Sequence, residues 1–159
     1  MHILFHQYDL IRQRRETLLQ YCESLSSEHF TADLENFGGR SISYLLVHTA
    51  NTYNFWLGDF TKLGKKPPVK AENYQTVDRV RKLYDDVNKT AEKFLTVFNP
   101  SPEQPITNKI PNGEMEITIT PLQLFTHVIT HEYHHKGQIL SMSRHLGYTP
   151  IDTDVIRFD

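Results

Sequence analysis

Two histidines four residues apart, His131 and His135, are the side chains of this sequence best suited to hold a metal ion. On an α-helix, residues four apart lie one turn apart on the same side, with about 5–6 Å between their Cβ atoms. Their ring nitrogens can therefore meet at a point about 2 Å from a metal ion, as in many zinc sites. Two ligands hold a metal weakly, so a third ligand must come from elsewhere in the chain.

A helical wheel separates the histidines of this segment. With about 100° per residue, His131 and His135 fall beside Leu124, Val128 and Met142, on the side that would face a core. The other histidines of the segment fall toward a polar flank, and we expect them at the surface or at an interface: His127, His134 and His145.

A third ligand is available in His48, the one histidine within the body of another expected helix. His48 lies about one turn from the middle of its helix, while His131 and His135 straddle the middle of theirs. Packed side by side, the two helices would bring all three imidazoles to one level. The sequence thus predicts a three-histidine site.

The alternative is that these are three core histidines hydrogen-bonded to hydroxyl or carbonyl groups. Burying several imidazoles without partners costs free energy, so the pair together with a third histidine at matching depth favours a metal. Three neutral ligands leave the charge of the cation undiminished and a coordination position open, as in catalytic sites. Histidine ligation suits zinc, nickel, copper or iron, and the spacing of the histidines does not choose among these metals.

The same residues match the H-E-x-x-H pattern of metallopeptidases, in which the glutamate is the general base. No glutamate follows Glu132, however, and no third histidine stands at the spacing of the longer form of the motif. Glu132 lies about 100° around the helix from His131. We expect it to pair with an arginine of another helix, such as Arg14 or Arg15.

Four long amphipathic segments must position these residues. In each, apolar residues recur at spacings of three, four and seven, the pattern of a helix with one buried face. Helices of about 33–40 Å pack naturally as a four-helix bundle, so we predict an all-α fold in a single domain, residues 1–159. The expected helices cover residues 4–25, 41–63, 76–98 and 121–146.

The connections add two expectations. The linker over residues 64–73, with Pro67-Pro68, could cross the full length of a helix at about 3.3 Å per residue, which would allow parallel second and third helices. Apolar residues on both sides of Asn112-Gly113 predict a short hairpin or an extended loop before the last helix. That helix should begin after Thr120 as N-cap, with Pro121 first, and end at Gly147.

Composition excludes several classes of protein. The chain has 159 residues, 38% of them hydrophobic, and a net charge of −2, the balance of a globular protein. Its 17 basic residues are spread out and offset by 19 acidic ones, so we expect no nucleic-acid partner. No apolar run is long enough for a membrane span, and the first residues lack the order of a signal peptide, so we expect no membrane partner and a cytoplasmic protein. The single cysteine, Cys22, is expected to be a small core residue.

The motifs of this chain resemble those of the DinB family, the DinB/YfiT-like metalloenzymes. The fourth helix carries the more specific part, from His127-Val128-x-x-His131-Glu132-x-x-His135 to Lys136-Gly137-Gln138-Ile139. Weaker similarity covers Phe5-His6-Gln7-Tyr8, Tyr44-Leu45-Leu46-Val47-His48 with Trp56-Leu57, and Leu146-Gly147-Tyr148 through Asp154.

The resemblance implies an up-down-down-up four-helix bundle, usually a homodimer, with a divalent metal held by three histidines. Carried over residue by residue, those ligands are His48, His131 and His135, and we expect one divalent ion per chain, zinc or nickel. The better understood relatives are thiol S-transferases and isomerases that use a low-molecular-weight thiol such as bacillithiol, mycothiol or glutathione.

Our first hypothesis is therefore a metal-dependent transferase that binds a small thiol, lowers its pKa and presents the thiolate to a small electrophile. Tyr44, Thr52 and Gln138 would line the pocket. The alternatives are a metal-dependent hydrolase that activates water at the same open position, and a non-catalytic protein that binds a metal or a small molecule.

Overall fold

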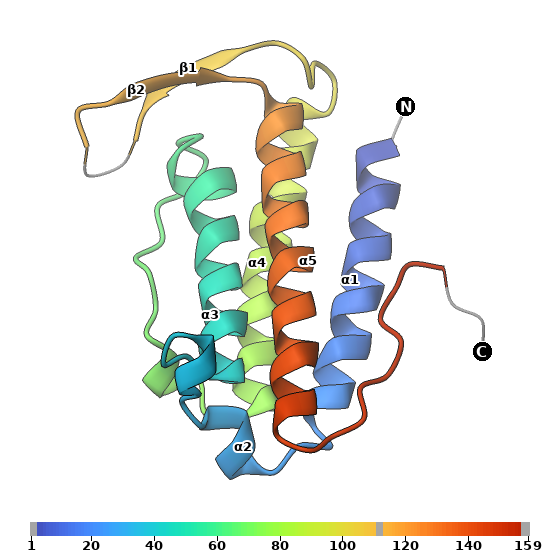
Figure 1. The fold of residues 1–159 in the computed structure, drawn as a ribbon. Helices are drawn as coiled ribbons and strands as arrows, with labels where there is room; N and C mark the ends of the chain where they lie inside the picture. The colour runs from blue at the N-terminus through green and yellow to red at the C-terminus, as the bar shows by residue number, and fades with distance from the viewer. Residues whose placement is uncertain (1–2, 111–112, 157–159) are drawn as a thin grey trace.

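Four long helices pack side by side and form the body of the molecule (Figure 1). The computed structural model describes residues 3–110 and 113–156. The helices are α1 (Ile3–Cys22), α3 (Ile42–Tyr53), α4 (Val77–Phe98) and α5 (Pro121–His145), with a short α2 (Ser27–Thr31) between the first two.

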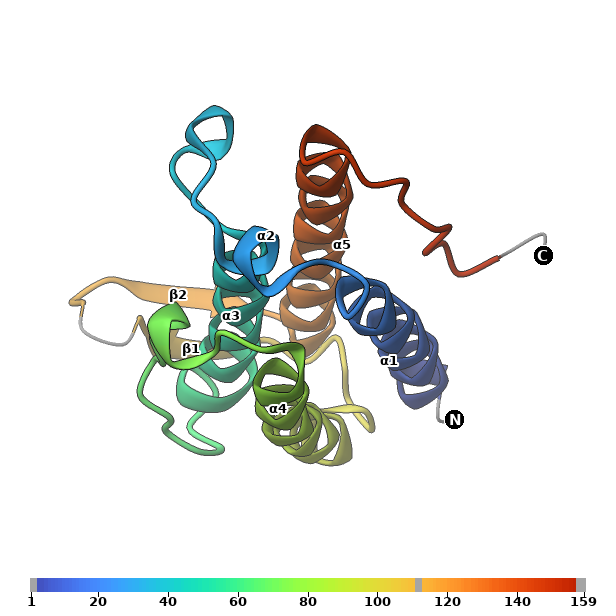
Figure 2. The same cartoon turned by 90° about the horizontal axis from the view of Figure 1, so that it is seen from below.

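The topology is up-down-down-up, as predicted. In Figure 1, α1 and α5 run downward while α3 and α4 run upward, so α3 and α4 are parallel. Helix α3 contacts both α4 and α5, and α4 also contacts α1. Figure 2, seen from below, shows the four helices arranged around a shared interior. The contact between α3 and α5 is the one that matters for the predicted site, because these helices carry its histidines.

Large aromatic side chains fill the interior. Tyr8, Tyr53, Phe60, Phe94 and Phe125 are among the largest side chains with less than 2% of their surface exposed. Burying an apolar side chain of this size stabilises the fold by about 1.5–3 kcal/mol.

The cysteine lies where its place on the first helix predicted. Cys22 is 1% exposed, packs in the core cluster and forms no disulfide. It is therefore a small apolar core residue.

The second predicted helix is not a single α-helix. It starts as expected, with the Ser41 hydroxyl accepting a hydrogen bond from the backbone N–H of Tyr44 at 3.0 Å. Its α-helical part ends at Tyr53 and continues as a π-helical segment, Asn54–Asp59, in which the Phe60 N–H bonds to the Phe55 carbonyl at 2.8 Å. Wider turns of this kind are frequent at functional sites.

A close backbone approach fixes the end of this segment. A Cβ added at Gly58 would lie 2.8 Å from the Gly64 carbonyl oxygen, so the chain that follows packs directly on Gly58. The Gly58 carbonyl also accepts a hydrogen bond from the Leu63 N–H at 3.0 Å. Only a residue without a side chain fits here unless the backbone shifts.

The linker after this turn returns along α3 and lets α4 start at the other end of the bundle (Figure 1). One side chain of α3 fastens it: the Asn51 amide donates to the Val69 carbonyl at 2.9 Å and accepts from the Val69 N–H at 3.0 Å. A 3₁₀ turn, Ala71–Asn73, closes the linker, and the Thr76 hydroxyl caps α4.

A two-stranded hairpin precedes the last helix, as one of the two predicted alternatives. Strands β1 (Ile106–Lys109) and β2 (Glu116–Ile119) are antiparallel, with Ile106 opposite Ile119, and they extend beyond the ends of the helices (Figure 1). The predicted turn at Asn112-Gly113 lies partly outside the described residues, since residues 111–112 are not among them.

Helix α5 has the predicted ends. Thr120 and Gln123 form a reciprocal capping box, and Pro121 is the first helical residue. Gly147 follows the last turn with a φ of 91°, a backbone angle that side chains disfavour. Beyond it, the chain folds back beside the bundle, where the Lys136 ammonium donates to the Thr153 carbonyl at 2.6 Å.

The polar stretch after α1 ends in a turn, as expected from its glycines. Gly38 and Gly39 both have positive φ angles, of 70° and 66°. The stretch also contains α2, which the sequence did not predict. Its N-cap is Ser26, whose hydroxyl accepts from the His29 N–H at 3.1 Å.

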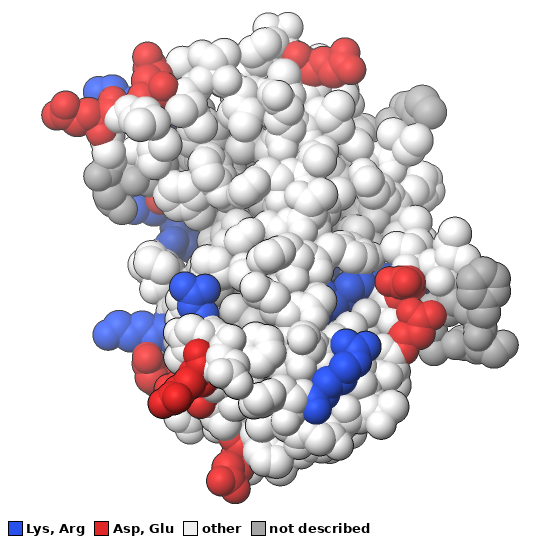
Figure 3. Space-filling view, in the orientation of Figure 1, with Lys and Arg blue, Asp and Glu red and all other residues white. Residues whose placement is uncertain are grey.

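Charged side chains of both signs are scattered over the face shown in Figure 3, and no broad area of that face carries a single sign. Among the described helices, none combines the length and the apolarity that a membrane-spanning helix requires.

Candidate metal centre

Three histidines from two helices bring their ring nitrogens together. His48 lies near the middle of α3, and His131 and His135 lie on either side of the middle of α5. The Nε2 atom of His131 is 3.1 Å from the Nε2 atoms of both His48 and His135. One ring nitrogen of each residue lies within 4.8 Å of the other two. The structure thus assembles the three residues that the spacing selected.

The spacing of these nitrogens fits a shared cation. Nitrogen ligands lie about 2.0–2.1 Å from zinc, so two of them at a tetrahedral angle are about 3.3 Å apart. The two 3.1 Å contacts are close to that value. A single proton on His131 Nε2 could bridge only one of these contacts, whereas a cation would satisfy all three nitrogens.

The environment keeps the three rings neutral. Burial and the neighbouring imidazoles, His135 first, lower the pKa of His131 to about 4. Burial, and to a smaller extent Arg40, lowers the pKa of His48, and burial also lowers the pKa of His135. A metal ion at neutral pH would therefore find free lone pairs without displacing protons.

The comparisons with known proteins cover almost the whole length of the chain. A sequence model of the DinB family matches residues 1–159. The chain belongs to the DinB family. It is also similar to the uncharacterized protein YizA of Bacillus subtilis (strain 168), with 26% identity over 148 residues, which cover 91% of this chain and 88% of the relative. In this DinB-family chain, the cluster of His48, His131 and His135 could hold one metal ion.

The other histidines of α5 are exposed, as the helical wheel predicted. His127, His134 and His145 all lie at the surface of this DinB-family chain. Two of them nevertheless touch the cluster: the His127 ring stacks on His131 with 5.8 Å between centroids, and His134 lies edge-on to His135 at 5.0 Å. They flank the candidate ligands and do not join them.

Two residues of α3 border the cluster. The Tyr44 ring stacks on His48, with an interplanar angle of 3°. The Thr52 hydroxyl donates to the His48 carbonyl at 2.9 Å, and its oxygen lies 3.3 Å from His131 Nε2. Since the hydroxyl proton is already committed, Thr52 presents a lone pair to the site and can accept a hydrogen bond from a bound molecule.

Gln138 fixes the orientation of one candidate ligand. It follows His135 by three residues in α5, and its side-chain oxygen lies 2.7 Å from His135 Nδ1. An amide oxygen only accepts, so Nδ1 carries the proton and Nε2 offers its lone pair to the cluster. A hydrogen bond of this kind commonly orients a metal-binding histidine.

Replacing this residue, as in Gln138→Leu, should weaken metal binding about 10- to 100-fold, because His135 loses the partner that sets its tautomer and ring angle. Competition with a chromophoric chelator measures the affinity. Gln20→Leu, an exposed change on α1, is the matched control and should leave the affinity unchanged. Equal affinity of Gln138→Leu and wild type would show that His135 needs no such support.

Glu132 points away from the cluster into a buried ion pair. Arg15 of α1 donates to its two carboxylate oxygens at 2.7 and 2.8 Å, and the Tyr53 hydroxyl donates to one of them at 2.6 Å. Arg15 also donates to the Asn88 side chain at 2.9 Å. Of the two arginines suggested by the sequence, Arg15 is therefore the partner.

This pairing argues against the peptidase interpretation of the H-E-x-x-H pattern. A general base must reach the reacting water, either directly or through one other water. Glu132 is 7% exposed, and its oxygens are bound by Arg15 and Tyr53. It supports the helix that carries His131.

A hollow of about 350 Å³ opens beside the cluster and includes His48 and Thr52 in its lining. The π-helical segment and the linker supply its other walls, with Asp59 and Lys66 among them. Sequence reasoning missed these residues. The only local sign of this arrangement in the sequence is the pair of glycines, Gly58 and Gly64, that allows the tight turn. The linker has no periodic pattern from which its position could be predicted.

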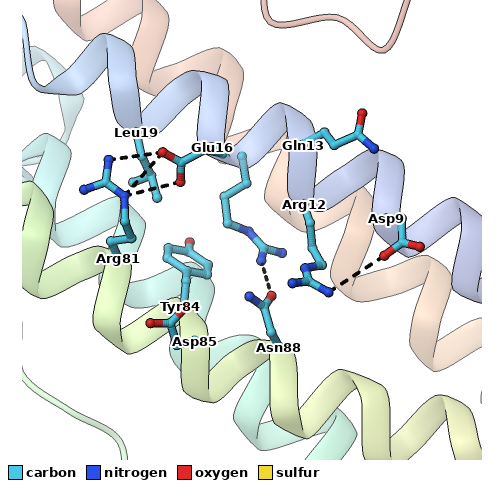
Figure 4. Close-up of a pocket in the computed structure, with 10 residues that line it drawn as sticks. Asp9, Arg12, Gln13, Glu16, Leu19, Arg81, Tyr84, Asp85 and Asn88 are labelled. Carbon is cyan, nitrogen blue, oxygen red and sulfur yellow. Dashed lines mark hydrogen bonds and ion pairs between the residues drawn. The ribbon is translucent and has the colours of Figure 1, made fainter.

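A larger hollow, of about 520 Å³, lies between α1 and α4 (Figure 4). None of the three histidines lines it. Its arginines are already paired: Arg81 with Glu16 at 3.2 Å, and Arg12 with Asp9 at 3.8 Å. The positive charges of Arg81 and Arg12 are therefore already balanced by carboxylates, which makes this larger hollow a weaker candidate for binding an anion.

Proposed function

We propose that this DinB-family chain is a metal-dependent transferase that activates a low-molecular-weight thiol for attack on a small electrophile. The observation that supports this function best is the meeting of three neutral imidazoles at one point. Three such ligands leave a divalent ion with an open coordination position.

The roles of the residues follow from their contacts. His48, His131 and His135 would hold one divalent ion, zinc or nickel, whose chemistry is to lower the pKa of a thiol bound to it. Gln138 holds the His135 ring in the orientation that exposes Nε2. Thr52 offers its oxygen as a hydrogen-bond acceptor to the substrate, and the exposed Tyr44 ring covers one side of His48.

The thiol must come from a small molecule, such as bacillithiol, because the protein's own cysteine is unsuitable. Burial raises the pKa of Cys22 to about 12. At pH 8 only about one molecule in 10⁴ would carry the thiolate, the form that reacts.

Cys22 should therefore resist a thiol reagent such as Ellman's reagent in the native protein at pH 8 and react fully after unfolding in guanidinium chloride. Absorbance at 412 nm follows the reaction. A free small thiol in the same buffer is the control for reagent activity. Stoichiometric labelling of the native protein within minutes would contradict both the burial of this thiol and its exclusion as a nucleophile.

The function is tested by loading the protein with zinc or nickel and measuring conjugation of monochlorobimane with bacillithiol, cysteine and glutathione. We expect a rate above that of the metal-free protein and of His135→Ala with at least one thiol. No rate above these controls with any thiol would overturn the proposal. Turnover without thiol would instead favour a hydrolase, and tight binding without turnover would favour a non-catalytic protein.

We also propose that the partners are a small-molecule substrate and a second copy of the chain, with no nucleic acid or membrane involved. The resemblance described above supports the homodimer. Light scattering should then give twice the chain mass of 18.6 kDa. A mass equal to that of one chain would contradict it.

A further inference from the structure

The hollow beside the histidine cluster has features of a built binding site. Its lining includes His48, a member of the cluster, and Thr52, which borders the cluster, so the hollow opens beside the candidate metal position. Phe55 and Trp56 form an aromatic part of its wall. Its volume, about 350 Å³, is at the lower end of the range for small-molecule sites and suits a ligand of amino-acid to dipeptide size.

Two opposite charges line this hollow without pairing with each other. Asp59 is partly buried, and in residues 3–110 and 113–156 its carboxylate has no hydrogen-bond or ion-pair partner. Lys66 is also partly buried, and its ammonium donates only to neutral oxygens, the Asp86 carbonyl at 3.0 Å and the Thr90 hydroxyl at 3.1 Å. An ammonium has three N–H donors, so one remains for a ligand. Partly buried charges without opposite partners are costly unless something else pairs them.

A buried amide adds a third polar group. Asn54 is 7% exposed, and its side-chain oxygen accepts from the Thr90 hydroxyl at 3.0 Å. Within the described part of the chain, no acceptor is bound to its side-chain N–H₂ group, and Asn54 lines the hollow. The hollow therefore offers an N–H donor and an ammonium for an anion, and a carboxylate for a cation.

We propose that this hollow binds the non-reacting part of the substrate, and that this part is a zwitterion. Asp59 pairs with its ammonium group, Lys66 and Asn54 bind its carboxylate, and Trp56 packs against its carbon atoms. The proposal deepens the proposed function, on which it rests for the position of the reactive atom at the metal. The larger hollow between α1 and α4 is a weaker candidate, because its arginines already have acidic partners.

The single tryptophan of the chain makes direct binding measurable. Trp56 lines the hollow, so its fluorescence should change when a ligand binds. The probes are L-cysteine, cysteamine, which has only the amine, and 3-mercaptopropionate, which has only the carboxylate. We expect L-cysteine to bind the zinc-loaded protein at least about tenfold more tightly than either analogue, since it alone makes both charge-assisted hydrogen bonds.

Two variants test which residue binds the ammonium group of the ligand and which binds its carboxylate. Asp59→Asn, which keeps the shape of the side chain, should weaken binding of L-cysteine and cysteamine about tenfold and leave 3-mercaptopropionate unchanged. Lys66→Met should weaken binding of 3-mercaptopropionate and leave binding of cysteamine unchanged. Two exposed residues that do not line this hollow serve as matched controls. Asp85→Asn, in the larger hollow between α1 and α4, and Lys65→Gln should bind all three probes as the wild type does. Thermal melts identify any loss of folding in Lys66→Met, and Asp59→Asn keeps the test decisive in that event.

Equal affinities for the three probes, or an Asp59→Asn variant that binds them as the wild type does, would overturn the proposal. The hydroxyl series L-serine, ethanolamine and 3-hydroxypropionate, titrated into metal-free protein, separates it from the proposed function. If L-serine binds more tightly than ethanolamine and 3-hydroxypropionate but no thiol is turned over, the zwitterion site in the hollow is supported and the transferase proposal is rejected. If thiol is turned over but Asp59→Asn and Lys66→Met bind the probes as the wild type does, the transferase proposal is supported and the zwitterion site in the hollow is rejected.

Discussion

Untagged wild-type protein should contain about one divalent metal ion per chain, and His48→Ala, His131→Ala and His135→Ala should each contain essentially none after dialysis. Each variant leaves two imidazoles, which hold a divalent ion far more weakly than three. Elemental analysis measures the metal content. Because a bound ion stabilises the folded state, zinc should also raise the melting temperature of the wild type and have little effect on the variants.

His145→Ala is the matched control, since His145 lies on the same helix but is exposed and is not one of the three clustered histidines. It should keep its metal. A wild type that contains no metal even after reloading with zinc or nickel would mean that the cluster is three core histidines, and the transferase proposal would fall with it.

Replacing Arg15 by methionine should lower the free energy of unfolding by about 3–5 kcal/mol. The side chains of Arg15 and Glu132 are 4% and 8% exposed, so the variant would leave a carboxylate buried without its cation. For a chain of this size each kcal/mol shifts the melting temperature by about 2–4 °C, so a loss of about 10 °C is expected. Urea unfolding followed by circular dichroism measures the free energy.

The double variant Arg15→Met/Glu132→Leu separates the attraction within the pair from the penalty of an unpaired charge. Replacing both partners by apolar residues is often close to neutral, so the double variant should recover most of the loss. Arg12→Met, at a partly exposed pair, should cost less than about 1 kcal/mol. An Arg15→Met variant as stable as the wild type would show that Glu132 finds water or another partner.

The bundle could be predicted from the sequence because its signals are local. The 3.6-residue periodicity predicted the four long helices, and the residue types of Ser41 and Thr120 predicted the starts of two of them. The length of the linker allowed a parallel arrangement of α3 and α4, and the resemblance to the DinB family implied it. These features depend on a few neighbouring residues each, and the tertiary structure does not override them.

The π-helical segment Asn54–Asp59 could not be predicted in this way. Its apolar residues continue the helical pattern, and the extra residue per turn becomes visible only when the chain packs back on Gly58. The short α2 was missed for a related reason. Its sequence is polar, and it buries one large residue, Phe30, against the rest of the fold.

In the candidate site, too, some residues could be predicted from local sequence and others depend on tertiary packing. The pair on α5 follows from a spacing of four, and His48 follows from its depth in a second helix. Asp59 and Lys66 line the same hollow because the linker lies along α3, where Asn51 binds Val69. No periodic pattern in the sequence predicts the contact between Asn51 and Val69.

The way the linker is attached bears on how related proteins could diverge. The linker is fastened to the bundle largely by side chains, above all by Asn51 and Lys66, and most of it forms no regular secondary structure. Substitutions, insertions or deletions there can reshape the hollow without moving the helices that carry His48, His131 and His135. Natural selection could thus change the molecule that is recognised while the metal chemistry stays the same.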